Sequence, residues 1–372
     1  MREQSVLDST AKGQALQSAE LGDRVQIGNT PFMQTTILRV SAATVLIVAS
    51  GFGQTERARS FPLSNVDGLV MAGKVKAEAV EYQGRKAVRL AYDGSGDGLA
   101  ILPDTDFQDG VIEADVALRV TTPAGVRNPG FIGIAFRARP NASHYDLFYL
   151  RPGNANAGDQ AMRNHAVQYV AEPGFSWYKL RREWPWIYES HIDLKPETWT
   201  TVRIEVAGRA AKIYVNGSAN PALIVEGLKG EDLHGAVALW GSPNQESYFS
   251  NVRITPAAPQ KLQNGADISG AWDLHYAGDV GAFDGSLRLK REGSKVTGSW
   301  SGGLAQDSAV TGTWRDGYVE LSFAGEWPKD IGLGEPGAVT VILAGWIDGN
   351  TGGGRMRVEG HSDGRWAATR KQ

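Results

Sequence analysis

Apolar and polar residues alternate with a period of two through residues 62–256, and the runs end at turn-forming residues. Because successive side chains on a strand point to opposite faces, this pattern predicts half-buried β-strands. In GVIEADVALRV the inward positions are Ile112, Ala114, Val116 and Leu118. No window carries a 3.6-residue apolar stripe longer than about two turns. We therefore expect a sandwich or barrel without long helices.

Two further stretches follow the same pattern. FIGIAFRAR places Ile132, Ile134 and Phe136 on one face, with Arg137 on the other. WTTVRIEVAGRAAKIYVNG predicts two strands around a turn at Gly208. A length of about 195 residues suits one large sandwich rather than two small ones.

The pattern changes beyond a Pro-, Ala- and Gln-rich linker at residues 257–267. Residues 268–372 contain short strands separated by Gly, and GSKVTGSWSGG is echoed by DSAVTGTWRDG. We expect an up-and-down antiparallel barrel of roughly eight strands, closed by GRWAATRKQ. This part holds six of the eleven tryptophans, which we expect in the barrel core: Trp272, Trp300, Trp314, Trp327, Trp346 and Trp366.

Composition limits the chemistry that this chain can perform. The 372 residues include 46 Gly, which fits a turn-rich β-protein, and no Cys, which excludes disulfides and thiol catalysis. Charged residues make up 21% and the net charge is −3, so no bulk electrostatic attraction to nucleic acid is expected.

The longest apolar run is ILRVSAATVLIVASGFG, residues 37–53. A positive residue, an apolar stretch and then small residues follow one another, which is the order of a signal peptide. We assign residues 33–54 to such a peptide, start translation at Met33, and treat residues 1–32 as a non-structural upstream extension. The alternative is a single-span or lipid-surface anchor. Either way the body is expected to be exported, to the periplasm or outside the cell, without a stable membrane span in its mature form.

An unusually polar stretch, DQAMRNHAVQYV, covers residues 159–170. We interpret residues 143–170 as two strands joined by a Gly/Asn loop. Pairing that puts Tyr149 and Arg151 on the same side as His165 and Tyr169 would create one patch of basic and aromatic groups. Buried without partners these groups would cost about 1–3 kcal/mol each. They are therefore expected to bond one another, to be solvated, or to receive a polar ligand.

Aromatic and charged residues interleave in FSWYKLRREWPWIYES, residues 175–190. Flat rings and charged forks together suit saccharides. The same mixture occurs in single-strand nucleic-acid sites, which the net charge disfavours. The structural alternative is a satellite core under a long loop, expected above all for Trp184 and Trp186, which flank Pro185.

The segments ETWTTVRIEVAGRAAKIYVNG and GAVALWGSPNQESYFSNVRI resemble the concanavalin A-like lectin/glucanase superfamily. Within it the similarity is closest to 3-keto-disaccharide hydrolase-like (family-16-glycosidase-like) domains, and residues 268–372 resemble lipocalin-like small barrels. The resemblance implies a jelly-roll sandwich and a glycan site. Family-16 enzymes carry two glutamates flanking an aspartate, whereas EADVALR offers Glu113 and Asp115 but Leu118 and Arg119. That pair is not carried over, and Glu113 and Asp115 are expected on a solvated strand face.

The sequence therefore predicts an all-β, exported, carbohydrate-active protein, with a glycoside hydrolase or lyase site on the concave face of a jelly roll. A non-catalytic lectin and a scaffold or adhesion protein are the alternatives. The expected partner is a saccharide or polysaccharide, anionic ones included. No cofactor is expected, although a calcium site could assemble from distant segments. The candidate catalytic residues are His165, Glu189, Asp159, Asp146 and Tyr169. The candidate substrate-binding residues are Tyr149, Arg151, Gln160, Arg163, Asn164, Gln168, Trp177, Tyr178, Arg181 and Arg137.

Overall fold

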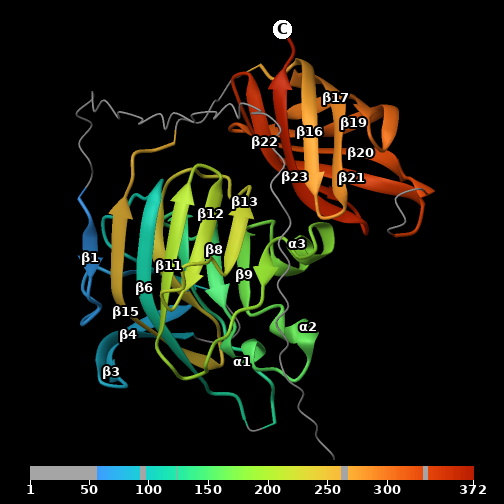
Figure 1. The fold of residues 1–372 in the computed structure, drawn as a ribbon. Helices are drawn as coiled ribbons and strands as arrows, with labels where there is room; N and C mark the ends of the chain where they lie inside the picture. The colour runs from blue at the N-terminus through green and yellow to red at the C-terminus, as the bar shows by residue number, and fades with distance from the viewer. Residues whose placement is uncertain (1–56, 93–97, 124, 261–266, 330–333) are drawn as a thin grey trace, which may run out of the picture. The chain divides into compact units, whose positions relative to one another are not determined.

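The structure is a computed structural model that describes residues 57–92, 98–123, 125–260, 267–329 and 334–372 (Figure 1). The predicted signal peptide, residues 33–54, and the upstream extension, residues 1–32, lie outside these ranges. Within them, no helix is long and apolar enough to cross a bilayer.

The described part of residues 62–256 forms a jelly-roll sandwich of two antiparallel sheets, which confirms the predicted fold class (Figure 1). The first sheet has eight strands in the described residues, with β1 (Arg59–Phe61) pairing to β15 at its side. Its other strands run in the order β13 (Leu223–Glu226), β12 (Ala210–Val215), β11 (Thr200–Ala207), β6 (Gly110–Val120), β15 (Gln245–Pro256), β4 (Arg85–Tyr92) and β3 (Val75–Tyr82).

The second sheet has seven strands in the same described ranges. Their order is β10 (Glu189–Ser190), β9 (Val167–Glu172), β8 (Tyr145–Leu150), β7 (Ile132–Ala138), β14 (Ala236–Gly241), β5 (Gly98–Ile101) and β2 (Val70–Gly73). Strands β8, β9 and β10 lie at one side of this sheet, and the candidate site is built on them.

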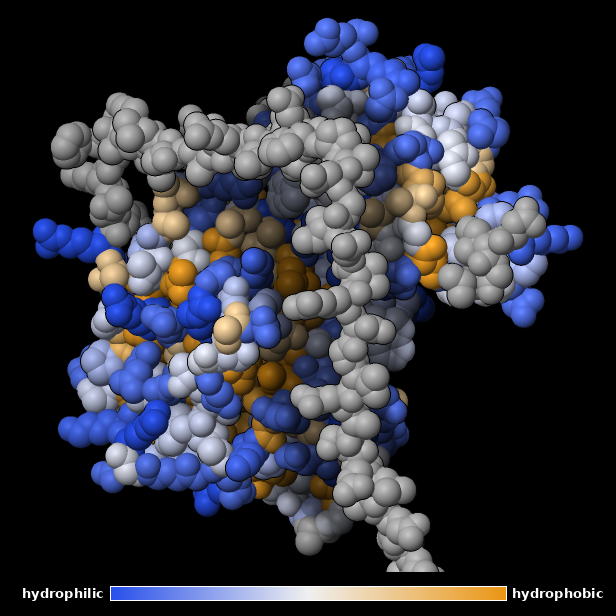
Figure 2. Space-filling view, viewed as in Figure 1, coloured by the Kyte–Doolittle hydropathy of each residue, from blue (hydrophilic) through white to orange (hydrophobic). Residues whose placement is uncertain are grey.

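The sandwich core contains the alternate positions that the sequence predicted. Ile112, Ala114, Val116 and Leu118 of β6 are all buried. Glu113 and Asp115 alternate with them and are partly exposed, as expected. Hydrophilic side chains are spread over the face seen in Figure 2, with hydrophobic ones between them. Each Å² of apolar surface that these side chains remove from water stabilises the folded sandwich by about 25 cal/mol.

The described part of residues 270–370 forms a closed antiparallel barrel of eight strands, also as predicted (Figure 1). In order they are β16 (Gly270–Gly278), β17 (Gly281–Glu292), β18 (Lys295–Gly302), β19 (Ala305–Arg315), β20 (Tyr318–Trp327), β21 (Gly337–Asp348), β22 (Thr351–Val358) and β23 (Ser362–Arg370). Closure pairs β23 with β16. Five of the six predicted tryptophans belong to its core, whereas Trp346 is half-buried and packs edge-on against Tyr318.

The polar stretch is not a strand along its whole length, which corrects the sequence prediction. Between β8 and β9 the chain forms two short helices, α1 (Pro152–Ala155) and α2 (Gln160–Arg163). The Asp159 side chain accepts a hydrogen bond from the N–H of Ala161 and begins α2. Asp at a helix N-cap satisfies a backbone donor that no intrahelical carbonyl can reach. A third helix, α3 (Trp177–Glu183), lies between β9 and β10.

The pairing of β8 with β9 also differs from the expected register. Tyr149 pairs with Gln168, and Phe148 pairs with Tyr169. Residues directly opposite each other share a face, so Gln168, not Tyr169, lies on the side of Tyr149. Tyr169 instead points toward the loop that follows β13 of the first sheet, where its hydroxyl accepts a hydrogen bond from the N–H of Lys229.

Candidate functional site

His165 lies at the junction between α2 and β9 and is held there by its backbone. Its N–H donates to the carbonyl of Met162 at 3.0 Å. Its carbonyl accepts from Arg151 Nη1 at 3.3 Å and from Asn154 Nδ2 at 3.2 Å. Asn154 lies in α1 and Met162 lies in α2, so both helices hold the His165 backbone and thereby fix the position from which its ring projects.

The His165 ring lies against a buried carboxylate. Its Nδ1 is 2.9 Å from Glu189 Oε2, and the Glu189 side chain is 2% exposed. Arg181 binds the same carboxylate at two points, Nε to Oε1 at 2.8 Å and Nη2 to Oε2 at 2.6 Å. A bidentate guanidinium fixes both the charge and the plane of a carboxylate. The ring N–H is not directed along the line to Glu189, so Nδ1 makes a close polar contact with the carboxylate rather than a well-formed hydrogen bond.

A buried cation, Arg151, also contacts His165 through its backbone carbonyl. Arg151 is 5% exposed, and its Nη2 donates to Tyr149 Oη at 2.6 Å and to Gln168 Oε1 at 3.3 Å. Its Nε has no hydrogen-bond partner. The ring of Trp177 lies 5.9 Å from the Arg151 guanidinium carbon and 4.8 Å from that of Arg181. These cation–π contacts orient an indole that is 44% exposed.

The electrostatic environment keeps His165 neutral. Burial is the main cause that lowers its pKa below the ordinary value of 6.5, and the positive charges of Arg181 and Arg151 lower it further, against the opposing effect of Glu189. The described residues place no hydrogen-bond partner at Nε2, and the side chain is 15% exposed. A neutral imidazole backed by a carboxylate can accept a proton at its outer nitrogen.

Trp186 covers the His165 ring on one side. The two rings are nearly parallel, at 9°, with centroids 6.4 Å apart. Trp186 is 61% exposed and has a φ of 67°, in the left-handed region that a bulky residue rarely adopts. Such a conformation costs about 1–3 kcal/mol and persists only where the surroundings impose it. An exposed, strained indole beside an imidazole is therefore a candidate ligand platform.

We predict that the NMR titration midpoint of His165 lies below 6.5, because burial disfavours the imidazolium. Glu189→Gln should lower the midpoint further, since it removes the charge that favours protonation. The folded pKa lies below the unfolded one. The contribution of His165 to stability is therefore complete above pH 6.5 and is lost as the pH falls through that value toward the folded pKa.

His361 provides an internal comparison in the same titration. Its two ring nitrogens contact the carbonyls of Glu359 and Glu335, and these hydrogen bonds raise its pKa. Its midpoint should lie above 6.5. A His165 midpoint at or above that of His361 would contradict the description of the site.

Two candidate catalytic residues, Asp146 and Tyr169, lie on the opposite face and do not join His165. The Tyr169 hydroxyl donates to Asp146 Oδ1, which also accepts from the N–H of Gly230 at 3.1 Å. Both side chains are fully buried, and burial raises both pKa values. They connect β8 and β9 to the loop after β13, which is a structural function.

Arg137 is also separate from the site, because it is 1% exposed and bound inside the sandwich. Its Nη2 donates to Asp109 Oδ1 at 3.0 Å and to the Gly208 carbonyl at 2.7 Å. The prediction of a substrate contact is corrected: these bonds tie β7 to the β11–β12 turn, and no donor faces solvent.

The remaining predicted residues shape the loop around His165 or stand at its edge. Asp159 caps α2, and Gln160 is exposed in its first turn. Arg163 Nη1 donates to the carbonyls of Ala157 and Gly158. Asn164 ends α2 through its own N–H. Tyr178 is 59% exposed and packs edge-on against Trp177.

Two residues of the site were missed by the sequence interpretation. Trp186 was expected in a satellite core, but only Trp184 packs against the sandwich core. Asn154 was read as part of a plain loop, yet it supports the His165 carbonyl. In the sequence, Trp186 is marked only by the preceding proline and the polar residues around it. These features do not indicate whether its ring packs into the core or lies exposed beside His165.

No family model matches the sequence, and no curated protein matches it. Solved structures do show similarity, over about half of the chain. One is carbohydrate binding module CBM66 from Bacillus subtilis, at 14% identity, covering 50% of this chain and 95% of that one, with a TM-score of 0.34. Another is domain 4 of AbnA, a GH43 extracellular arabinanase from Geobacillus stearothermophilus in complex with arabinotriose, at 16% identity, 55% and 93% coverage and a TM-score of 0.32. A third is Bacillus licheniformis beta-glucanase, at 12% identity, 55% and 100% coverage and a TM-score of 0.33. The likeness concerns the fold and carries no argument about activity.

In the part of the chain that the structure describes, no group of three or more His, Asp or Glu side chains is arranged to hold a metal ion.

Proposed function

We propose that this protein is an exported carbohydrate-active enzyme that binds a saccharide over His165 and uses its Nε2 as a general base. The observation that carries the proposal is the contact of 2.9 Å between His165 Nδ1 and a Glu189 carboxylate that Arg181 holds at two points. A saccharide is favoured because two exposed indoles, Trp177 and Trp186, accompany this polar group. Aromatic faces and a few fixed polar groups are what a sugar site requires.

The arrangement favours elimination over two-carboxylate hydrolysis. Glycoside hydrolysis needs an acid and a base or nucleophile on two carboxyl groups. Here both oxygens of Glu189 accept hydrogen bonds from Arg181. Among the described residues, Glu189 is the one carboxylate that contacts the His165 ring. A neutral histidine is instead suited to remove a proton from carbon.

The proposed step acts on a sugar in which a carbonyl or carboxylate activates the neighbouring C–H bond. His165 Nε2 takes the proton, and the C–H electron pair becomes an enolate. Collapse of the enolate forms the carbon–carbon double bond and breaks the bond to the glycosidic oxygen. That oxygen takes the proton from the His165 imidazolium and leaves as an alcohol, which restores the neutral histidine. The Arg151 and Arg181 guanidinium groups supply the positive potential that stabilises the enolate.

A substrate screen tests this proposal. Keto-glycosides and uronic-acid polymers are incubated with the protein, and ultraviolet absorbance from a new carbon–carbon double bond is followed. We expect absorbance to rise in at least one class, with an acidic limb of the pH–rate profile below pH 6.5 because the His165 pKa is lowered. New reducing ends without that absorbance would contradict elimination in favour of hydrolysis.

A non-catalytic lectin is the second candidate, and the exposure of Trp177, Tyr178 and Trp186 favours it. These rings offer a binding surface that needs no chemistry. In the same screen a lectin would raise the melting temperature with a saccharide and form no product. The narrower resemblance to 3-keto-disaccharide hydrolase-like domains and export through residues 33–54 also remain proposals. Amino-terminal sequencing of the secreted protein tests the latter.

A further inference from the structure

The segment that carries Trp186 is held by the barrel as well as by the sandwich. Arg357 of β22 donates from Nη1 to the carbonyl of Pro185 at 3.0 Å. The same guanidinium donates from Nε to Asp363 at 2.9 Å. Trp184 packs on the sandwich side, where the Lys229 ammonium lies 4.2 Å from its ring centre. Both contacts precede Trp186 in the chain, so the barrel and the sandwich together hold the residues that lead into its strained turn.

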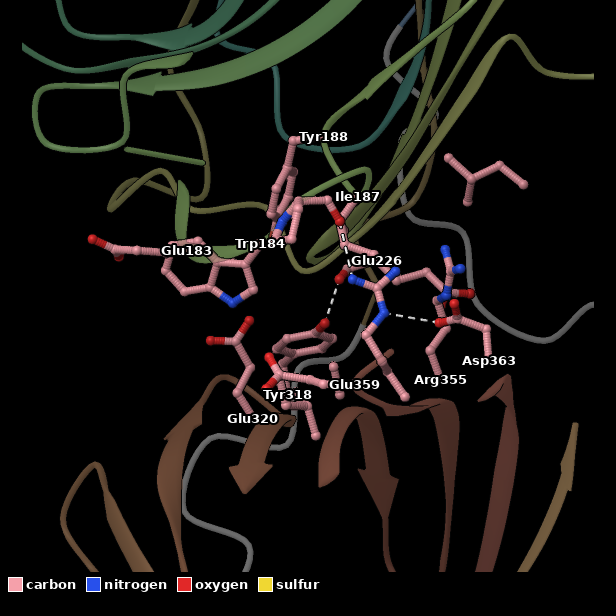
Figure 3. A pocket seen from close by; sticks show the side chains of 15 residues that line it. Glu183, Trp184, Ile187, Tyr188, Glu226, Tyr318, Glu320, Arg355, Glu359 and Asp363 are labelled. Atoms are coloured by element: carbon pink, nitrogen blue, oxygen red, sulfur yellow. Dashed lines mark hydrogen bonds and ion pairs between the residues drawn. The ribbon is translucent and has the colours of Figure 1, made fainter. Parts of the chain in front are cut away.

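A groove follows this segment. One hollow is lined by aromatic residues such as Trp184, Tyr188 and Tyr318 (Figure 3). A second hollow is lined by Trp186, Asp279 and His361. Four residues line both hollows, so the two are continuous: Pro185, Arg357, Glu359 and Asp363. We call the combined feature the seam groove.

Trp186 connects the seam groove to His165. Its ring stacks beside the imidazole, and the same residue lines the second hollow. A ligand over His165 that extends past this indole therefore enters the seam groove. Its walls combine flat aromatic faces with carboxylates and two arginines, Arg355 and Arg357, and such groups bind sugar rings and hydroxyls.

The charges in the groove select against an acidic sugar. Asp279, Glu359 and Asp363 line the second hollow. The Arg357 charge is already paired with Asp363. In the second hollow the other basic side chain is His361, whose two ring nitrogens are occupied by carbonyls. Arg355 lines the first hollow, where Glu183, Glu226, Glu320 and Glu359 also lie. Carboxylates accept hydrogen bonds from neutral hydroxyl groups, whereas a uronate would meet like charge.

We propose that the barrel supplies additional subsites for a neutral oligosaccharide whose terminal unit, activated by a carbonyl rather than a carboxylate, lies over His165. This inference rests on the proposed sugar site and names its substrate as a chain longer than a disaccharide. It gives the barrel a direct part in recognition through Arg357 and the turn at Pro185 and Trp186.

Calorimetric titration of the full chain with neutral glucose oligomers tests the inference without any turnover. We expect the hexasaccharide to bind about tenfold more tightly than the disaccharide, because further rings stack in the groove. Arg357→Ala and Trp186→Ala should each remove this gain. Asp363→Asn gives a second measurement in the groove and should reduce the gain. The control Lys290→Ala, whose ammonium pairs with Glu292 outside the groove, should keep it.

Equal affinity for both lengths overturns the inference, and so does a length gain that survives Arg357→Ala and Trp186→Ala. A comparable gain with a hexauronate would overturn its neutral selectivity. The two proposals fail separately: binding that grows with length without any product leaves the subsites intact and removes the enzyme, whereas elimination without length dependence does the reverse.

Discussion

Replacing His165 with glutamine is expected to lower kcat/KM for elimination by about 10²–10⁴-fold, the usual contribution of a positioned general base. Glutamine keeps a polar side chain of similar reach but cannot accept the proton. Because the Arg151 and Asn154 contacts are to the His165 backbone carbonyl, they persist in the variant. Saccharide affinity should therefore change little. Initial rates and calorimetric titration on the same preparation measure the two effects.

The matched control is His144→Gln. His144 also contacts a glutamate, with its Nε2 3.2 Å from Glu231, but Glu231 is 66% exposed and no guanidinium binds it at two points. This change should leave the rate within a factor of about two. Equal losses in the two variants would remove His165 from the proposed chemistry, and retention of turnover in His165→Gln would do the same.

Replacing Arg137 with methionine is expected to reduce the free energy of unfolding by about 3–5 kcal/mol, because it leaves a buried carboxylate without its cation. The side chains of Arg137 and Asp109 are 1% and 2% exposed. Asp109 also accepts from the N–H groups of Gly208 and Gln260, at 3.0 Å and 2.6 Å. The loss therefore disturbs β7, the β11–β12 turn and the chain beyond β15 together.

Urea unfolding followed by tryptophan fluorescence measures this loss. The control Arg119→Met removes an arginine whose side chain is 51% exposed beside Glu246, and it should leave the free energy of unfolding nearly unchanged. The double variant Arg137→Met/Asp109→Leu removes both charges of the pair. It should recover part of the lost stability, because no unpaired charge remains in the core. An unchanged unfolding midpoint in Arg137→Met would show that the pair is not structural.

The difference between Arg137 and Arg151 shows why the sequence could not sort its own candidates. Both are arginines at the ends of predicted strands, and both are buried. Arg137 meets Asp109, which is remote in sequence and was not among the candidates. Arg151 donates hydrogen bonds to Tyr149 and Gln168, which were both among the predicted site residues. Only the three-dimensional pairing of strands decides which partner a long side chain reaches.

Local signals explain part of what was overlooked. Asp159 precedes a turn of helix and satisfies a free N–H there, which is a capping signal that can be read in sequence. Recognising it would have placed a turn of helix before His165 and moved the start of the second predicted strand toward Val167. The register of β8 against β9 has no comparable signal, because both faces of these strands are buried and neither phase of the alternation is favoured.

The alternation of side chains and the spacing of glycines and tryptophans by themselves determined the two β-architectures, since period-two burial and tight turns are properties of the local chain. The residue types near His165 likewise indicated a polar, aromatic site. The tertiary structure decided that Glu189 and Arg181 meet His165 while Asp146, Tyr169 and Arg137 do not. Those contacts depend on strand register and on loops that bring distant segments together, and neither leaves a trace in local sequence.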